Sequence, residues 1–293
     1  MLRLLPAPVR GVLTATLLGL NTLFFSLAMV PPALLKLVLP DGALRQGCTR
    51  AIAALASAWV AVNNGWIGAV SQKAWDVQGT DGMKRQSWYL VSPNHQTWVD
   101  ILVLQRVFHG RIPFLKFFLK KELIWVPVIG LVWWALDFPF MARGKGRAST
   151  HDDLRSAREA CEKFMRMPTT VINFVEGTRH TPAKHQAQGS PYHHLLKPKT
   201  GGLGVALSTM GSQFEALLDV TLVYPDGVPT FWQLLCGQAG AVVVRVQQRP
   251  IPPDLCGGDP MTDKALRRRT AAWVDMQWSE KDLLIDELKG PRR

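Results

Sequence analysis

The longest feature of the hydrophobic pattern is an uncharged stretch at residues 11–35. Proline lacks an amide donor and its ring clashes with the preceding helical turn, so Pro31 and Pro32 are predicted to end a helix near Val30. The segment 11–30 has about the length that spans the hydrocarbon core of a bilayer. A cleaved signal peptide is the alternative, but its apolar core would be shorter and followed by small residues.

A second uncharged stretch covers residues 51–70 and is interrupted by Asn63, Asn64 and Gly65. It is compatible with a second membrane span, an interfacial helix or a buried helix. A Pro-Asp-Gly turn within 39–42 would join the two stretches as a helical hairpin. Basic residues flank the first stretch on both sides, so charge does not fix its orientation in a membrane.

A third apolar segment, residues 123–142, contains Pro127, Gly130, Asp137 and Pro139. Its length suits a membrane span. The prolines and the carboxylate equally suit a buried wall or a surface that dips into the membrane.

The remainder of the chain alternates short apolar runs with longer amphipathic segments. Strands are predicted at 87–91, 169–175, 217–224 and 241–246, and helices at 97–108, 152–167, 202–210 and 262–288. Thr97 is the expected N-cap of the 97–108 helix. The alternation indicates an α/β layer architecture, in which sites usually lie in loops that follow strands.

The composition narrows the class of partner. The net charge of +12 favours an anionic partner, and 11 tryptophans in a chain that is 47% apolar favour a membrane over nucleic acid. No zinc-finger or RNA-recognition pattern supports nucleic-acid binding. The four cysteines have no CxxC spacing, so a zinc ribbon or redox pair is disfavoured and a reducing compartment is favoured.

The first segment with candidate chemistry is 94–100, where His95 follows a predicted strand and Asp100 lies in the first turn of a predicted helix. Asp100 can accept a hydrogen bond from one imidazole nitrogen of His95, which leaves the other nitrogen basic. This is the arrangement of a general base that acts on an alcohol. Taken alone, the pair is better explained as a histidine that caps a helix beside an unrelated aspartate.

The second such segment is 173–179, which again follows a predicted strand and contains Glu176, Gly177, Thr178 and Arg179. Glycine allows close backbone approach, Thr178 offers a hydroxyl, and the guanidinium of Arg179 suits phosphate. An ordinary turn with a surface ion pair is the alternative.

Together these segments resemble the glycerolipid acyltransferase family, which includes the bacterial 1-acylglycerol-3-phosphate acyltransferases. Its His-x4-Asp and Glu-Gly-Thr-Arg motifs are matched here some 80 residues apart. Two further family blocks occur in order, at 120–130 continuing to 140–143 and at 220–225. The resemblance covers roughly residues 88–225.

Two positions depart from the family pattern: Val175 stands where proline is usual and Ala142 where aspartate is usual. These departures leave the identity of the acceptor open. Several stretches, including 134–137 and 173–177, resemble the YihG-like inner-membrane acyltransferases of proteobacteria.

The resemblance implies an α/β fold with a mixed sheet flanked by helices, behind the apolar hairpin. It also implies transfer of an acyl group from acyl-CoA or acyl-acyl carrier protein to a lysophospholipid hydroxyl, with 1-acyl-glycerol-3-phosphate as the leading acceptor. His95 would be the general base and Asp100 its orienting carboxylate, without an acyl-enzyme, metal or other cofactor. The residues expected to bind substrate are Asn94, Lys120, Lys121, Arg143, Glu176, Gly177, Thr178, Arg179 and Pro225.

The expected organisation is 1–72 as membrane-associated helices, 73–250 as the catalytic domain and 251–293 as a C-terminal helical extension. The expected location is the cell inner membrane, with the catalytic domain facing the cytoplasm. The expected partners are membrane lipids and the acyl donor, and not nucleic acid. Lys120 and Lys121 could instead be solvated surface lysines.

Other activities have weaker support. A serine hydrolase is disfavoured because the chain has no Gly-x-Ser-x-Gly elbow. A zinc site could use His180, His185, His193 and His194, but His-Glu-x-x-His is absent. A non-catalytic lipid-binding scaffold is the alternative to an enzyme. The basic run at 267–269 would suit an acidic carrier protein, an anionic lipid or plain solvation.

Overall fold

A computed structural model describes residues 4–117, 119–120, 124–126, 129–136, 138, 140–141, 147–165 and 167–289. Its main sheet has six strands in the order β1-β8-β7-β2-β6-β3. Neighbouring strands are parallel except for the β7–β8 pair, so the sheet is mixed, as expected. The strands are β1 Trp75–Gln78, β2 Trp88–Pro93, β3 Leu115–Phe117, β6 Thr170–Ile172, β7 Phe214–Val223 and β8 Val242–Arg249, and β4 Leu119–Lys120 pairs separately with β5 Phe140–Met141.

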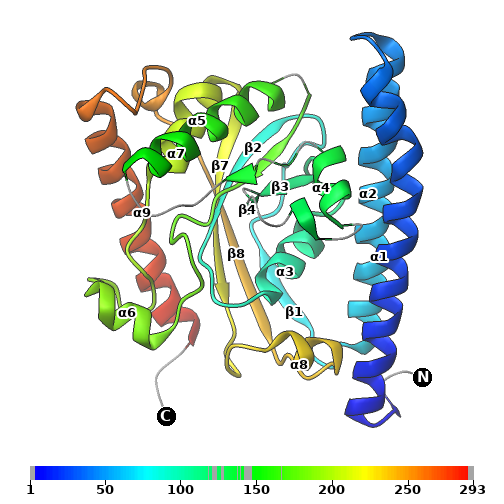
Figure 1. Cartoon of the computed structure of the whole chain (residues 1–293). Coiled ribbons are helices and arrows are strands. Elements are labelled where there is room, and N and C mark those ends of the chain that lie inside the picture. Colours follow the sequence, from blue (N-terminus) through cyan, green and yellow to red (C-terminus); the bar gives the residue numbers. More distant parts are fainter. Residues whose placement is uncertain are drawn as a thin grey trace.

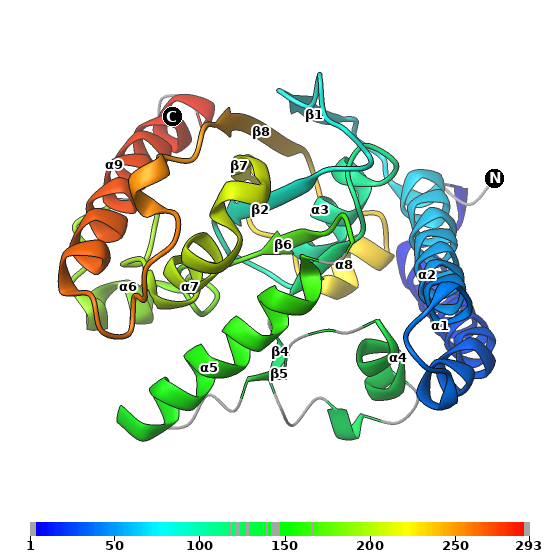
Figure 2. The same ribbon diagram turned by 90° about the horizontal axis from the view of Figure 1, so that it is seen from above.

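Helices cover both faces of the sheet, and the alternation of strand side chains explains why. Along β2, Tyr89 and Val91 enter one apolar core and Leu90 enters the other. The first core is closed by α3 (Val99–Phe108), and the second by α5 (Arg147–Phe164), α7 (Gly201–Met210) and α9 (Lys264–Lys289). Figure 2 shows α5, α7 and α9 on one side of the sheet and α3 on the other.

The predicted hairpin is present. Helix α1 (Ala7–Val38) and helix α2 (Ala43–Val70) run side by side along the flank of the molecule opposite α9 (Figure 1). Both helices are long and apolar enough to cross a membrane by length and composition. Many large apolar side chains of α1 are exposed, among them Leu20, Leu23, Phe24, Leu27, Leu34 and Leu37.

The prediction that the prolines end the first helix near Val30 was wrong. Helix α1 continues through Pro31 and Pro32 to Val38. The prolines lack the amide donors for two helical hydrogen bonds. The helix is nevertheless held by packing just after them, because Ala33 lies in an apolar cluster with Ile52 of α2 and Phe138. Tertiary packing therefore overrides the local helix-breaking tendency.

The second helix is longer than predicted, and its polar interruption does not break it. Asn21 of α1 donates from Nδ2 to Oδ1 of Asn63 at 2.7 Å and to the carbonyl of Trp59 at 3.2 Å. Because both asparagines are buried, this pair fixes the register of the two helices.

The open end of the hairpin, where α1 begins and α2 ends, is attached to the rest of the fold. Arg10 donates from Nε to the carbonyl of Cys236 at 2.5 Å, next to α8 (Phe231–Leu235). Arg106 of α3 donates to the carbonyl of Asn64 at 3.0 Å, and Ile67 lies in the core closed by α3. The division into three parts stays a prediction.

The described residues of the third apolar segment do not form one spanning helix, because α4 (Ile129–Ala135) has only seven residues and is followed by β5. Leu136 and Phe138 pack against the hairpin, which agrees with a buried wall. Pro127, Asp137 and Pro139 lie outside the described residues.

Candidate active site

The turn that carries His95 is fixed to the sheet by a buried amide. Asn94, directly after β2, donates from Nδ2 to the carbonyl of Leu222 at 2.9 Å and accepts the amide of Leu222 at 2.8 Å. Asn94 is almost fully buried and holds the turn against β7. Its expected role as a substrate contact stays a prediction.

The expected pair of His95 and Asp100 is formed. Nδ1 of His95 donates to Oδ2 of Asp100 at 2.8 Å, and the same oxygen accepts the amides of Gln96 at 2.6 Å and Thr97 at 2.9 Å. The Asp100 side chain is 0% exposed and that of His95 is 13% exposed. An ionised carboxylate only accepts, so Nδ1 carries the proton and Nε2, the nitrogen with no hydrogen bond to a described residue, is the basic one.

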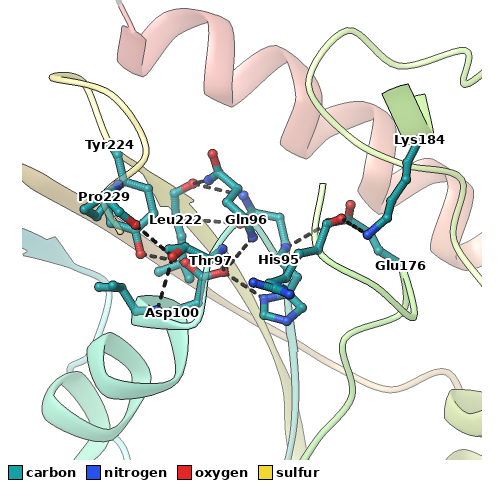
Figure 3. Close-up of polar contacts among 12 residues, drawn as sticks. His95, Gln96, Thr97, Asp100, Glu176, Lys184, Leu222, Tyr224 and Pro229 are labelled. Carbon is teal, nitrogen blue, oxygen red and sulfur yellow. Dashed lines mark hydrogen bonds and ion pairs between the residues drawn. The ribbon is translucent and has the colours of Figure 1, made fainter. Parts of the chain in front are cut away.

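Tyr224 completes this arrangement from the end of β7. Its hydroxyl donates to Oδ1 of Asp100 at 2.6 Å, and Figure 3 shows Tyr224 and His95 on different sides of the carboxylate. The side chain is buried, and burial together with the neighbouring Asp100 carboxylate raises the pKa of the phenol well above its ordinary value. Tyr224 therefore stays protonated and remains a donor.

Thr97 is not the N-cap that the sequence predicted. Helix α3 begins at Val99 after Trp98, and the Thr97 hydroxyl donates to the carbonyl of Pro229 at 2.8 Å. The Asp100 carboxylate accepts the free amides before the helix instead, which binds this first turn to the catalytic pair.

Glu176 is placed differently from the expectation that it contacts the acceptor. Its side chain is fully buried, with one oxygen accepting the amide of His95 at 2.9 Å and the other accepting the amide of Leu196 at 3.1 Å. Burial raises the pKa of Glu176 to about 7, against the opposing effect of these two amides. The carboxylate thus holds the backbone of the histidine in place.

The rest of the Glu-Gly-Thr-Arg segment lies at the surface beside His95. The amide of His180 donates to the carbonyl of His95 at 2.7 Å, which joins the two motifs. Gly177 has φ of +68°, and a β-carbon there would lie 3.2 Å from Cδ of Lys199. The left-handed backbone conformation therefore favours glycine, whereas the flexible Lys199 side chain needs to shift only slightly to admit a β-carbon.

Two cations border this turn. Lys184 donates from Nζ to the hydroxyl of Thr178 at 2.7 Å and to the carbonyl of Arg179 at 3.1 Å. The guanidinium of Arg179 lies 5.0 Å from the ring centroid of Trp98, and both side chains are exposed. A cation stacked in this way beside the catalytic turn is free to meet a solvent-borne anion.

An aromatic series leads away from the histidine. The His95 ring stacks on Phe174 with a centroid distance of 4.0 Å, Phe117 lies 6.5 Å from Phe174, and Phe138 lies 6.1 Å from Phe117. Phe114 follows at 6.4 Å and lines a cavity of about 260 Å³ against α2. The series is a row of apolar rings that lies between the catalytic turn and that cavity.

The remaining expected substrate contacts stay predictions. Pro225 is exposed and follows Tyr224 after the end of β7. Lys120 belongs to β4, and its side chain lies outside the described residues, as do Lys121 and Arg143 altogether.

Two of the four histidines considered for zinc have hydrogen-bond partners of their own. His185 contacts the carbonyl of Tyr192 at 2.6 Å, and His194 contacts Asp286 at 2.6 Å. Within the described ranges no three His, Cys, Asp or Glu side chains gather as metal ligands. His185 belongs to the short helix α6 (Pro182–Gln188).

Comparison with known proteins assigns the family. The family model described as Acyltransferase matches residues 74–225. The chain belongs to the acyltransferase family. It is 30% identical over 217 residues to the mouse 1-acyl-sn-glycerol-3-phosphate acyltransferase delta, covering 68% of this chain and 52% of that protein. It is 32% identical over 213 residues to 1-acyl-sn-glycerol-3-phosphate acyltransferase 2 of Arabidopsis thaliana, covering 68% and 51%.

The chain thus spans about half the length of these curated relatives. A solved acyltransferase structure, the 1-acyl-sn-glycerophosphate acyltransferase PlsC from Thermotoga maritima, matches 98% of this chain and 100% of that one, with a TM-score of 0.58 and 18% identity. This likeness confirms the predicted fold. The resemblance to the YihG-like branch stays a prediction.

Proposed function

We propose that this acyltransferase moves a fatty acyl group from an acyl thioester to the free hydroxyl of a lysophospholipid, with 1-acyl-glycerol-3-phosphate as acceptor and phosphatidic acid as product. The observation that carries the proposal is the buried, four-donor Asp100 beneath a histidine whose Nε2 is unpaired among the described residues. A carboxylate fixed in this way holds the imidazole in one tautomer.

The chemistry follows from that tautomer. Nε2 of His95 takes the proton of the acceptor hydroxyl, and the resulting oxygen nucleophile attacks the thioester carbonyl carbon. The carbon–sulfur bond breaks, and the leaving thiolate takes the proton from the imidazolium. Asp100 stabilises the imidazolium in between. The acyl group moves in one displacement sequence, without an acyl-enzyme.

The surroundings of His95 suggest where each substrate part lies. Arg179, with Lys184 beside it, would hold the phosphate of the acceptor. The aromatic series from Phe174 to Phe114 would hold the acyl chain. The exposed apolar face of α1 supports membrane association, and we propose the inner membrane with the catalytic domain in the cytoplasm. The donor would be acyl-CoA or acyl-acyl carrier protein, with no cofactor.

Labelled acyl-CoA and 1-acyl-glycerol-3-phosphate, added to the full-length protein in phospholipid vesicles, test this function. Labelled phosphatidic acid should form, and His95→Ala should lose it by about 10²–10⁴-fold, the usual contribution of a general base. His193→Ala is the matched control, because that histidine is largely exposed away from the pair. Both variants should remain in the membrane fraction.

Two results would contradict the proposal. Near-normal transfer by His95→Ala would remove the histidine from the mechanism. No transfer to any lysophospholipid would favour a lipid-binding scaffold. A panel of lysophospholipid headgroups in the same assay also decides the acceptor, which the departures at Ala142 and Val175 leave open.

A further inference from the structure

A fully buried lysine reaches the catalytic turn from the C-terminal helix. Lys281 of α9 donates from Nζ to the carbonyl of Ser92 at 2.8 Å and to the carbonyl of Val220 at 2.7 Å. These carbonyls belong to β2 and β7, the strands that deliver His95 and Tyr224. The lysine side chain is 0% exposed, and buried lysines need such complete pairing.

The positive charge of Lys281 is balanced by a buried carboxylate. Its ammonium lies 2.7 Å from Oδ1 of Asp219 on β7, and Oδ2 of Asp219 accepts from Nε of Arg249 at 2.9 Å. Arg249 also donates from Nη2 to Oε2 of Glu280 on α9 at 2.5 Å. Strands β7 and β8 and helix α9 are therefore joined by one chain of alternating charges.

Neighbouring residues of α9 act on the loop that holds Glu176. Trp278 donates from its indole nitrogen to the carbonyl of Leu196 at 3.2 Å, while the amide of Leu196 donates to Glu176. Asp282 accepts the amides of His193 at 2.7 Å and His194 at 2.8 Å in the same loop. One turn of α9 thus supports both the strand ends and the loop around the catalytic turn.

We propose that Lys281 is a positioning residue of the catalytic turn: its ammonium fixes the strand ends behind His95 and favours the ionised form of Glu176, which holds the amide of His95. The inference rests on the proposed function and extends it, because α9 lies beyond the residues that match the family model. An ionised Glu176 accepts both backbone amides, whereas a protonated one has an O–H that cannot accept equally well.

The charges that face Glu176 agree with this role. Burial raises its pKa to about 7, the Lys281 ammonium lowers it, and the Asp100 carboxylate raises it further; the amides of His95 and Leu196 also lower it. Burial lowers the pKa of Lys281, and the neighbouring Asp219 carboxylate opposes that effect. The Lys281 ammonium adds to the two amides in opposing the effect of burial on the pKa of Glu176.

The decisive variant is the double substitution Lys281→Met/Asp219→Asn. The single substitution Lys281→Met removes the ammonium that pairs with the buried Asp219 carboxylate, so that variant could fail to fold. The double variant removes both charges of the pair and is tested beside the single one. In the double variant, the acid limb of the pH–rate profile of acyl transfer should move to higher pH by about one unit, which is the effect of losing one nearby charge. At pH 7 the rate should fall about five-fold and recover at higher pH, with KM for the acceptor unchanged.

A second measurement does not need activity. The full-length protein, labelled with carboxyl-¹³C glutamate and assigned with Glu176→Gln, reports the Glu176 titration directly by NMR. The pH midpoint of the Glu176 titration should rise in the double variant. It should not change in the control Lys264→Met, which removes an exposed lysine from the same helix. An unmoved midpoint, or a loss of rate that is equal at every pH, overturns the proposal. If no lysolipid is acylated by the wild type, the proposed function fails, while this titration still decides whether Lys281 controls Glu176.

Discussion

The hydroxyl of Tyr224 lies 2.6 Å from Oδ1 of Asp100, so the carboxylate that orients His95 is itself held from a separate strand. One oxygen of Asp100 serves the imidazole and the turn amides, and the other serves the phenol. With both oxygens occupied, the carboxylate cannot rotate away from the histidine. The orientation of the general base therefore depends on the contact between β7 and α3.

Tyr224→Phe removes this support while keeping the ring in the core. A hydrogen bond to a charged group contributes about 1.5–3 kcal/mol, so we expect kcat to fall about 10-fold or more with KM for both substrates little changed. Steady-state kinetics of the vesicle assay measure the split. Tyr192→Phe, which alters a phenol on the α9 side of the protein, is the control. A rise in KM with constant kcat would place Tyr224 in substrate binding instead.

Glu176 should set opposite pH trends for activity and stability. Its pKa rises on folding from an ordinary 4.5 to about 7, so the folded state binds the extra proton between these values. The unfolding free energy should therefore fall as pH rises from about 4.5 to 7, by about 3 kcal/mol from this group, whereas activity should rise as the carboxylate ionises.

Thermal unfolding in detergent at several pH values, for the wild type and Glu176→Gln, isolates this contribution. The difference in unfolding free energy between the two proteins should change in favour of the variant as pH rises through this window. A difference that is constant with pH would mean that Glu176 titrates in the folded state as it does in the unfolded chain.

Arg179 should discriminate acceptors by their phosphate. Its guanidinium is exposed and oriented by stacking on Trp98. We expect Arg179→Ala to raise KM for 1-acyl-glycerol-3-phosphate about 10- to 100-fold and to leave KM for a monoacylglycerol unchanged, because only the first carries the charge. Arg245→Ala, which breaks a pair with Asp76 on β1, serves as the control. Equal effects on both acceptors would contradict a phosphate contact.

The parts of the site that follow local patterns were predictable from the sequence. A strand, a turn and a helix start place His95 and Asp100 five residues apart, and this local geometry survives in the fold. The hairpin followed from two long uncharged stretches. The strands β1 and β3 were missed because they are short, and a run of three or four residues has little periodicity to detect.

The remaining site residues depend on contacts that the sequence does not contain. Tyr224 meets Asp100 across 124 positions, and Lys281 lies in a helix whose charged composition suggests a solvated surface. Nor does a Glu-Gly-Thr-Arg motif say which side chain faces inward. Glu176 is buried and Arg179 is exposed, and Gly177 with its positive φ lies between them.

The Asn21–Asn63 hydrogen bond should stabilise the hairpin through pairing and not through either side chain alone. In apolar surroundings, an asparagine whose partner is removed has no water to replace it. We therefore expect Asn21→Leu and Asn63→Leu each to lower the unfolding free energy, and the double variant to lose less than their sum. The coupling should be about 0.6–2 kcal/mol, the range for polar contacts between membrane helices.

Thermal unfolding in detergent measures this double-mutant cycle. The control is Asn64→Leu, which changes the neighbouring asparagine outside the contact. Additive single losses would show that the two helices are held by apolar packing alone, with their register set by Ala33 and Ile52.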